Sequence, residues 1–238
     1  MPGGRRVYAV GDVHGRRDLL DALLEKIERH CREDPPEAIT LVCLGDYVDR
    51  GPSSKEVVDR LAHGLPSGFQ AVLLRGNHEH MLLSFLHDPY SGLRWLKNGG
   101  DATLLSYGVP QWTVRNALRH PEALPEAAHA FRAALSSDHL LFYRSLALYH
   151  REGDYFFVHA GVRPGRALDE QHEHDLLWIR DEFLDWPADY GAVVVHGHTP
   201  ARFQEDKRNR IGIDTYAFAS GRLTAVVLEG AERRFITS

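Results

Sequence analysis

The chain has 238 residues, a length that suits one large domain or one domain with an insertion. Apolar residues make up 43% of it, which is enough for a sizeable core. The formal net charge of −5 provides no basic surface, so we expect no extended binding of nucleic acid.

The first third of the chain alternates between predicted strands and helices. Short apolar runs rich in β-branched residues predict three strands, at residues 6–10, 39–44 and 69–74. Leucines and an isoleucine recur at helical spacing between residues 19 and 27, which predicts a helix that ends near His30. This β–α–β–α–β order favours a parallel sheet with right-handed crossovers.

Two further helices are predicted in the same region. Ser53 and Glu56 form the pattern of a capping box, so a helix should begin there and end at Gly64. Another should run through Met81 and Phe85, where apolar residues again recur at helical spacing. Each helix follows one of the predicted strands, as a βαβ arrangement requires.

Residues 88–145 interrupt this alternation. The segment is rich in Ala, Leu, Arg and His, and helical spacing is clearest between Ala123 and Leu135. We interpret it as a helical insertion within a single domain that comprises residues 1–238. Two roles are left open, a cover over the functional site and a plain surface elaboration.

The remainder of the chain is rich in predicted strands. Runs at residues 146–150 and 155–158 flank Arg151–Asp154, a pattern typical of a hairpin. Three more strands are expected at residues 192–195, 210–213 and 223–228. We group all five in a second sheet, because two sheets packed face to face with helices outside would bury this many apolar strands.

Cysteine content and hydropathy predict a cytoplasmic protein. The two cysteines, Cys31 and Cys43, are too few for a disulfide framework, and Cys43 lies inside an apolar run. We find no apolar signal region before the first predicted strand. No apolar run approaches the roughly 20 residues that a membrane-spanning helix needs. We therefore expect no membrane partner.

Five short motifs each follow directly on a predicted strand. They are Gly11–Gly15, Gly45–Gly51, Gly76–Glu79, His159–Gly161 and His196–Pro200. Ligands collect at the carboxyl ends of strands in open α/β sheets, so the five motifs predict one site. Each motif alone is weakly specific, but all five in this order are hard to obtain by chance.

The motifs contain six side chains that suit divalent metals. They are Asp12, His14, Asp46, Asn77, His159 and His198. These carboxylate, imidazole and amide groups suit ions such as Mn, Fe or Zn. They are not the ligands of a structural zinc site, which is built from cysteines. Six ligands exceed the needs of one ion, so we expect two divalent ions that share a carboxylate, the usual device for in-line displacement at phosphorus.

Three other motif residues suit catalysis. The planar guanidinium of Arg50 can bind phosphate oxygens at two points. His78 follows the predicted ligand Asn77 and is a candidate general acid, whose ring Asp49 could orient.

The remaining histidines carry weaker signals. His196 is a minor candidate for the site, since it precedes His198 by two residues. Most of the others, His139 among them, are expected at the surface or at the boundaries of elements. His172 and His174 lie in the acidic stretch 169–175, which we interpret as a solvated loop.

The motifs resemble those of the phosphoprotein phosphatase branch of the calcineurin-like metallophosphoesterases. Gly-Asp-x-His-Gly, Gly-Asp-x-Val-Asp-Arg-Gly and Gly-Asn-His-Glu are signatures of that family, and all three are intact at residues 11–15, 45–51 and 76–79. The resemblance extends from Val7 to about Leu228. It implies an α/β fold, the four-layer αββα sandwich of calcineurin-like metallophosphoesterases, here with the helical insertion.

The resemblance also implies a role for each matching residue. One metal would be held by Asp12, His14 and Asp46. The other would be held by the bridging Asp46 together with Asn77, His159 and His198. His78 would protonate the leaving oxygen with Asp49 behind it, and Arg50 would bind the phosphoryl group.

Two further segments resemble the family. Trp178-Ile179-Arg180 matches a Trp-x-Arg-like pattern, which implies that Arg180 binds phosphate. Asn98-Gly99-Gly100 is similar to a turn near the substrate entrance.

His-Gly-His-Thr-Pro at 196–200 is typical of bacterial members of the family, including bacteriophage-type serine/threonine phosphatases and symmetrical diadenosine tetraphosphatases. We therefore expect a bacterial-type protein serine/threonine phosphatase, with manganese as the first choice of metal. A hydroxide that bridges the two metals would attack the phosphomonoester.

Two alternatives remain. The first is a symmetrical diadenosine tetraphosphate hydrolase that yields two ADP, although Tyr216 stands where those enzymes usually have a small residue. The bases and phosphates of that substrate could be held by aromatic and basic residues of the insertion, for which the candidates are Tyr90, Arg94, Trp95, Lys97, Tyr107, Trp112 and Arg115. The second is a catalytically silent metal-binding scaffold, which would have no need of His78. The sequence does not specify the substrate, the metal or the oligomeric state.

Overall fold

The computed structural model describes Met1 and residues 4–238, and its first sheet has five strands. Its order is β10-β9-β1-β2-β3, with bounds β1 Arg5–Val10, β2 Ala38–Cys43, β3 Phe69–Leu73, β9 Thr224–Glu229 and β10 Glu232–Thr237. The three N-terminal strands are parallel, β9 pairs antiparallel with β1, and β10 pairs antiparallel with β9. The β–α–β–α–β order of the sequence accounts for the parallel part.

The second sheet is also mixed. Its order is β4-β5-β6-β8-β7, with bounds β4 Tyr149–Glu152, β5 Tyr155–Val158, β6 Val193–His196, β7 Glu205–Asp206 and β8 Arg210–Gly212. β5, β6 and β8 are parallel, and the two edge strands are antiparallel to their neighbours. The carboxyl ends of β5 and β6 therefore lie at one edge of this sheet.

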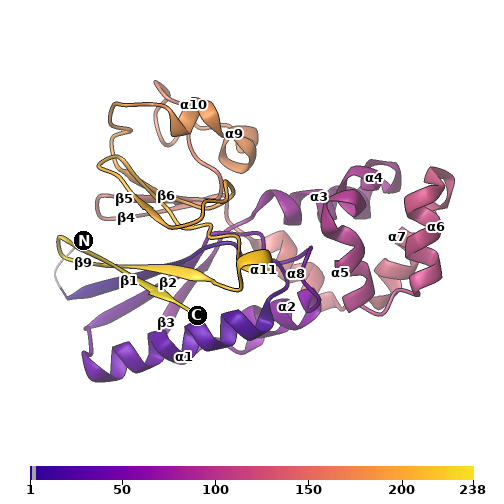
Figure 1. Ribbon diagram of the computed structural model, residues 1–238, viewed down its shortest axis with the longest axis horizontal. Coiled ribbons are helices and arrows are strands. Elements are labelled where there is room, and N and C mark those ends of the chain that lie inside the picture. The colour runs from indigo at the N-terminus through magenta and orange to yellow at the C-terminus, as the bar shows by residue number, and fades with distance from the viewer. Residues whose placement is uncertain (2–3) are drawn as a thin grey trace.

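Helices cover the outer face of each sheet (Figure 1). α1 (Arg17–Glu33) and α2 (Ser54–His63) pack on the first sheet, whereas α9 (Glu173–Trp178) and α10 (Asp181–Leu184) pack on the second. These four layers confirm the predicted αββα sandwich.

Alternation along the strands builds the layers. In β1, Val7 and Ala9 join an apolar cluster between the sheets, and Tyr8 and Val10 join the cluster beneath the helices. Successive side chains of a strand point to opposite faces, so a strand buried on both sides is apolar throughout. All four of these side chains are fully buried.

Residues 77–145 are helical and extend to one side of the sandwich (Figure 1). The α-helices are α3 Asn77–His87, α4 Gly92–Trp95, α5 Asp101–Ser106, α6 Gln111–Arg119, α7 Leu124–Ala134 and α8 Ser137–Ser145. Short 3₁₀-helices lie at 89–91 and 121–123, and a π-helical turn lies at 96–100. Their buried side chains continue the core beneath α1 and α2. Treating residues 88–145 as an insertion within one domain stays a prediction.

No helix among the described residues has the length and apolarity needed to cross a bilayer.

The predicted grouping of strands needs two corrections. Residues 223–228 do not join the second sheet, because β9 pairs antiparallel with β1. The strand expected at 146–150 begins at Tyr149, and Ala147 forms only an isolated bridge with Leu74, the residue after β3. Sheet membership depends on pairing between distant segments, which the local pattern does not encode.

Three local predictions also differ. Ser53 precedes α2 but its side chain caps nothing; instead Ser54 Oγ accepts the backbone N–H of Asp49 at 3.0 Å. The expected loop at 169–175 turns into α9 at Glu173, and Asp175 is buried. His139 is buried as well, bonded to Tyr107 and to a carboxylate of α2. The partners of His139 lie 32 and 80 residues away in the sequence, where no local pattern marks them.

Candidate metal centre

The six predicted metal ligands converge at the ends of strands from both sheets. Asp12, Asp46 and Asn77 follow β1, β2 and β3, and His159 and His198 follow β5 and β6. All six, His14 included, are at most 6% exposed. The parallel strands of each sheet therefore bring together polar groups that stand as much as 186 residues apart in the chain.

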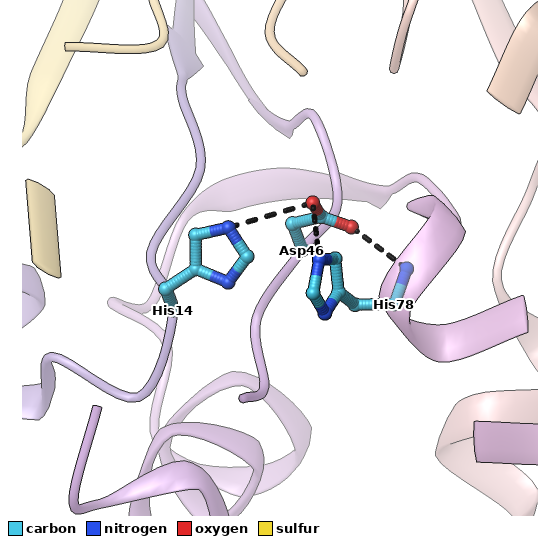
Figure 2. Close-up of side chains that lie close together, drawn as sticks. All are labelled: His14, Asp46 and His78. Atoms are coloured by element: carbon cyan, nitrogen blue, oxygen red, sulfur yellow. Dashed lines mark hydrogen bonds and ion pairs between the residues drawn. The ribbon is translucent and has the colours of Figure 1, made fainter. Parts of the chain in front are cut away.

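Asp46 is the centre of this cluster. Its Oδ2 lies 3.5 Å from His14 Nε2 and 3.8 Å from His78 Nε2 (Figure 2). Its Oδ1 lies 3.5 Å from His159 Nε2. Two groups able to hold a metal share this carboxylate: one is His14, Asp46 and His78, and the other is Asp46, His159 and His198. The first group contains His78 where the sequence predicts Asp12.

Two of the imidazoles are held with Nε2 directed into the cluster. His14 donates its Nδ1–H to the carbonyl of Val48, and His159 donates its Nδ1–H to the carbonyl of Leu44, both at 2.9 Å. A carbonyl accepts only from a protonated nitrogen, so the lone pair of each ring lies on Nε2. This orientation of a metal-binding histidine by its second nitrogen is common in metalloproteins.

Asn77 and Asp12 complete the donor set. Asn77 Oδ1 lies 2.8 Å from His159 Nε2 and 2.9 Å from His198 Nδ1. Both oxygens of Asp12 accept the backbone N–H of His198, at 3.1 and 3.2 Å. His198 Nε2 is buried without a hydrogen-bond partner among the described residues.

The charges of the cluster call for cations. Burial, together with the charges of Asp214 and Asp46, raises the pKa of Asp12 well above its ordinary value. Burial, then the charge of His78, lowers the pKa of His14 to about 3, so its imidazole is neutral. Buried carboxylates that repel one another beside neutral imidazoles are stabilised by metal ions. The donor chemistry therefore fits divalent metals.

The His78 ring lies between this cluster and a buried carboxylate. Its Nδ1 is 2.6 Å from Asp49 Oδ2, which also accepts the indole N–H of Trp95 at 2.7 Å. Thr103 donates to the other oxygen of Asp49 at 2.6 Å. Burial alone would lower the pKa of His78, but Asp46 and Asp49 outweigh it and raise this pKa.

Two arginines border the cluster. The guanidinium of Arg50 lies 2.9 Å from His14 Nε2 and 3.2 Å from His78 Nε2. Arg180 approaches the carbonyl of His198 at 3.5 Å. Both arginines line an open hollow of about 470 Å³, which Lys97, Asn98 and Gly99 also line. The structure thus brings Arg50 and Arg180 to one hollow beside the six ligands.

Some residues behave differently from the predictions. His196 does not enter the cluster, because its ring packs against Phe183 with centroids 4.9 Å apart. Among the candidates for stacking on a base, Trp95 and Tyr107 are only 1% and 6% exposed, whereas Tyr90 and Trp112 are 65% and 63% exposed.

Sequence reasoning also missed residues that support the site. Glu79 accepts the backbone N–H groups of Asp46, Tyr47, Val48 and Gly76, at 2.7–3.3 Å. Its place in the Gly-Asn-His-Glu motif was an available signal. Nothing local marked Trp95 or Thr103 as partners of Asp49.

Comparison with known proteins identifies the family. A model of the calcineurin-like phosphoesterases matches residues 5–227. Serine/threonine-protein phosphatase 1 of Salmonella typhimurium strain LT2 is 32% identical over 225 residues, which cover 92% of this chain and 90% of that protein. The asymmetrical bis(5'-nucleosyl)-tetraphosphatase PrpE of Bacillus velezensis is 28% identical over 238 residues, covering 90% of this chain and 86% of that protein.

The fold is also similar to that of a solved structure. A crystal structure of a protein provisionally named diadenosine tetraphosphatase superposes with a TM-score of 0.65 at 24% identity, covering 98% of this chain and 93% of that one. At this identity the likeness bears on the fold alone. The family model, by contrast, spans most of the sequence and includes all five motifs. This chain therefore belongs to the calcineurin-like phosphoesterase family of hydrolases.

Proposed function

We propose that this chain is a two-metal phosphatase that hydrolyses phosphomonoesters on serine and threonine side chains of proteins. One observation carries the proposal: the buried carboxylate of Asp46 is shared by two groups of metal-binding side chains, with Arg50 beside them. Divalent cations bound there, manganese first and iron or zinc as alternatives, would supply an activated water and neutralise charge on the phosphoryl group.

We assign the ligands as the resemblance implies. Asp12, His14 and Asp46 would hold one cation, and Asp46, Asn77, His159 and His198 would hold the other. The fixed Nδ1–H of His14 and of His159 supports this assignment, because it leaves Nε2 free to bind a metal.

Arg50 and Arg180 would bind the phosphoryl oxygens. Both line the same hollow, and their guanidinium groups offer paired N–H donors to an anion. Arg50 contacts two imidazoles, those of His14 and His78, and its charge stays available to a substrate.

His78 would donate the proton to the leaving oxygen. Asp49 holds Nδ1–H of His78 at 2.6 Å, which directs Nε2 toward Asp46 and the hollow. Asp46 and Asp49 raise the pKa of His78, which favours the protonated ring that a general acid requires. Asp49 is fully buried and accepts three hydrogen bonds, so it orients His78 and does not itself meet substrate.

The choice of a phosphoprotein substrate rests on similarity. The Salmonella relative is named a serine/threonine-protein phosphatase and matches over nearly its full length. The open hollow also suits a phosphorylated side chain on a protein surface. We propose a cytoplasmic location, with which the two unpaired cysteines agree.

The test is phosphate release by manganese-reconstituted protein from a phosphothreonine peptide. We expect turnover that chelation abolishes and manganese restores. Two bound metals without phosphate release from this peptide or from para-nitrophenyl phosphate would contradict the proposal.

A further inference from the structure

Two side chains from the helices beside the sandwich bond the carboxylate behind His78. Trp95, the last residue of α4, donates its indole N–H to Asp49 Oδ2 at 2.7 Å. Thr103, in α5, donates its hydroxyl to Asp49 Oδ1 at 2.6 Å. His78 donates its Nδ1–H to Oδ2 at 2.6 Å. Each oxygen of Asp49 therefore has a donor from a segment that lies outside the five motifs.

These donors fix the direction of the carboxylate. The terminal torsion of an aspartate is soft, and a donor at each oxygen removes this freedom. The backbone of Asp49 also needs support, because its φ of 75° is left-handed. Its N–H donates to the same Thr103 hydroxyl at 2.9 Å. One threonine thus holds both the main chain and the side chain of Asp49.

The indole of Trp95 is itself fixed by its neighbours. It is almost fully buried, and its ring lies against Phe85 and Phe131, with centroids 5.0 and 6.1 Å from theirs. A Cβ on Gly100 would come within 2.5 Å of the indole, so only glycine fits there. Close packing of this kind holds a side chain in one rotamer, and the N–H of Trp95 is directed at Asp49.

We propose that Trp95 and Thr103 are positioning residues for the proton transfer, because they hold Asp49 so that His78 presents Nε2 to the leaving oxygen. This inference rests on the proposed phosphatase function. The oxygen of water bonds to phosphorus as the bond to the serine or threonine oxygen breaks, and that oxygen takes the proton from Nε2. One proton of the water stays on the phosphate. The other passes to solvent, from which His78 is protonated again.

A role in stability alone is the competing explanation, because a buried carboxylate needs hydrogen bonds wherever it lies. The two explanations differ in how the loss of activity depends on the leaving group. The alkoxide of threonine is a strong base and needs a proton in order to leave, whereas 2,4-dinitrophenolate is a weak base that leaves without one. A misplaced acid therefore slows only the first reaction, and a general loosening of the site slows both.

The experiment measures kcat of the manganese-reconstituted chain on a phosphothreonine peptide and on 2,4-dinitrophenyl phosphate. Thr103→Val removes the hydroxyl at nearly constant shape, and Thr103→Ser keeps it. Trp95→Phe removes the indole N–H but keeps an aromatic ring. Thr113→Val makes the same change at a buried threonine of α6 and is the matched control.

A spectroscopic measurement accompanies the kinetics and does not depend on turnover. The Nδ1–H of His78 donates a short hydrogen bond to Asp49, so its proton resonance should lie far downfield. Proton NMR of the zinc-loaded chain follows this signal, which His78→Asn assigns by removing it.

We expect Thr103→Val and Trp95→Phe to lower kcat on the peptide by about 10- to 100-fold, since misplacing a group by about 1 Å can cost about 100-fold. Their kcat on 2,4-dinitrophenyl phosphate should stay unchanged. Thr103→Ser and Thr113→Val should match the unmodified chain on both substrates. The downfield proton should disappear in the first two variants and persist in the other two.

Three results would overturn this inference and leave the phosphatase proposal standing. They are equal losses on both substrates, full activity of Thr103→Val and Trp95→Phe on the peptide, and a Thr103→Ser variant no better than Thr103→Val. Release of phosphate from neither substrate by the unmodified chain would overturn the proposed function and this inference together.

Discussion

At the scale of single residues, backbone strain is concentrated in the candidate site. Six non-glycine residues of the described chain have positive φ, and five of them are predicted site residues, namely His14, Asp46, Asp49, Arg50 and His198. Left-handed backbone costs an L-residue roughly 1–2 kcal/mol, so it persists where surrounding contacts hold it. Glycines beside these residues allow the close approach: a Cβ on Gly197 would collide with Asp12 Oδ1. The motifs therefore lower the stability of the fold in order to hold these side chains in place.

Replacing His78 by Asn tests the proposed acid. Asparagine can bond Asp49 but cannot transfer a proton, so we expect kcat to fall by about 10²–10⁴-fold. Metal content, measured by mass spectrometry of the reconstituted protein, should stay at two ions per chain. Loss of one ion would make His78 a ligand, as its grouping with His14 and Asp46 allows.

At the scale of elements, the start of α3 organises the loop after β2. Glu79 lies in the first turn of α3, and its carboxylate collects backbone N–H groups from two strand-end loops. That joins the Asp46 loop to the helix that carries Asn77 and His78. The sequence predicts β2 and α3 correctly. The hydrogen bonds from the Asp46 loop to Glu79 depend on how these two elements pack together in the fold.

Glu79→Gln should weaken both the fold and the metal site. The amide keeps one acceptor oxygen and turns its NH₂ toward backbone donors, so we expect a loss of about 1–3 kcal/mol in the free energy of unfolding. Manganese affinity should fall about 10–100-fold, the usual effect of disturbing groups behind metal ligands. Denaturant unfolding and metal titration check this, with exposed Glu122→Gln as the control. Equal stability of the two variants would contradict it.

Asp175 at α9 predicts a pH dependence of stability. Arg163 binds it at two points, at 3.0 and 2.6 Å, and these hydrogen bonds lower the pKa of Asp175 below its ordinary value. A carboxyl with a lowered folded-state pKa stabilises the fold above its unfolded pKa, and this contribution disappears as the pH falls through the folded pKa.

Asp175→Asn should therefore destabilise the protein at pH 7 by about 1 kcal/mol, a value reduced by the partial exposure of Arg163. The difference from the unmodified chain should shrink as the pH falls below the ordinary Asp pKa and vanish once the pH has passed the lowered folded-state pKa. Asp189→Asn, which removes an exposed pair with Arg208, serves as the control and should change nothing. A difference independent of pH would exclude the ionic explanation.

At the scale of the whole molecule, the two sheets are coupled through the candidate metal centre. Asp46 and Asn77 come from the first sheet, and His159 and His198 from the second. Most side chains packed between the sheets are apolar, and the buried carboxylates and imidazoles lie beside them at the strand ends. Cations that bind only the folded chain would join the two halves and stabilise both.

Chelation should then lower the melting temperature. Ions at about 100 times their Kd contribute about 2.7 kcal/mol, which corresponds to a shift of about 5–10 °C for a chain of this size. Scanning calorimetry with and without chelator measures it, and manganese should restore the original value. Asp46→Asn, which removes the shared ligand, should abolish the shift. A melting temperature that does not respond to chelation would contradict the coupling.

Side-chain type and local spacing predicted two packed sheets and a set of candidate metal ligands. Periods of two and 3.6 residues are properties of neighbouring residues, so the strands and helices around the motifs could be predicted. Metal preference follows from the chemistry of Asp12, His14 and the other motif side chains, which needs no coordinates.

Only the tertiary structure decided which distant segments meet. It joined β9 to β1 and brought Trp95 and Thr103 to Asp49. These contacts depend on the packing of whole elements, in which a hydrogen-bond partner can come from any segment that arrives there. The sequence therefore indicated the chemistry of the centre, and the fold determined its surroundings.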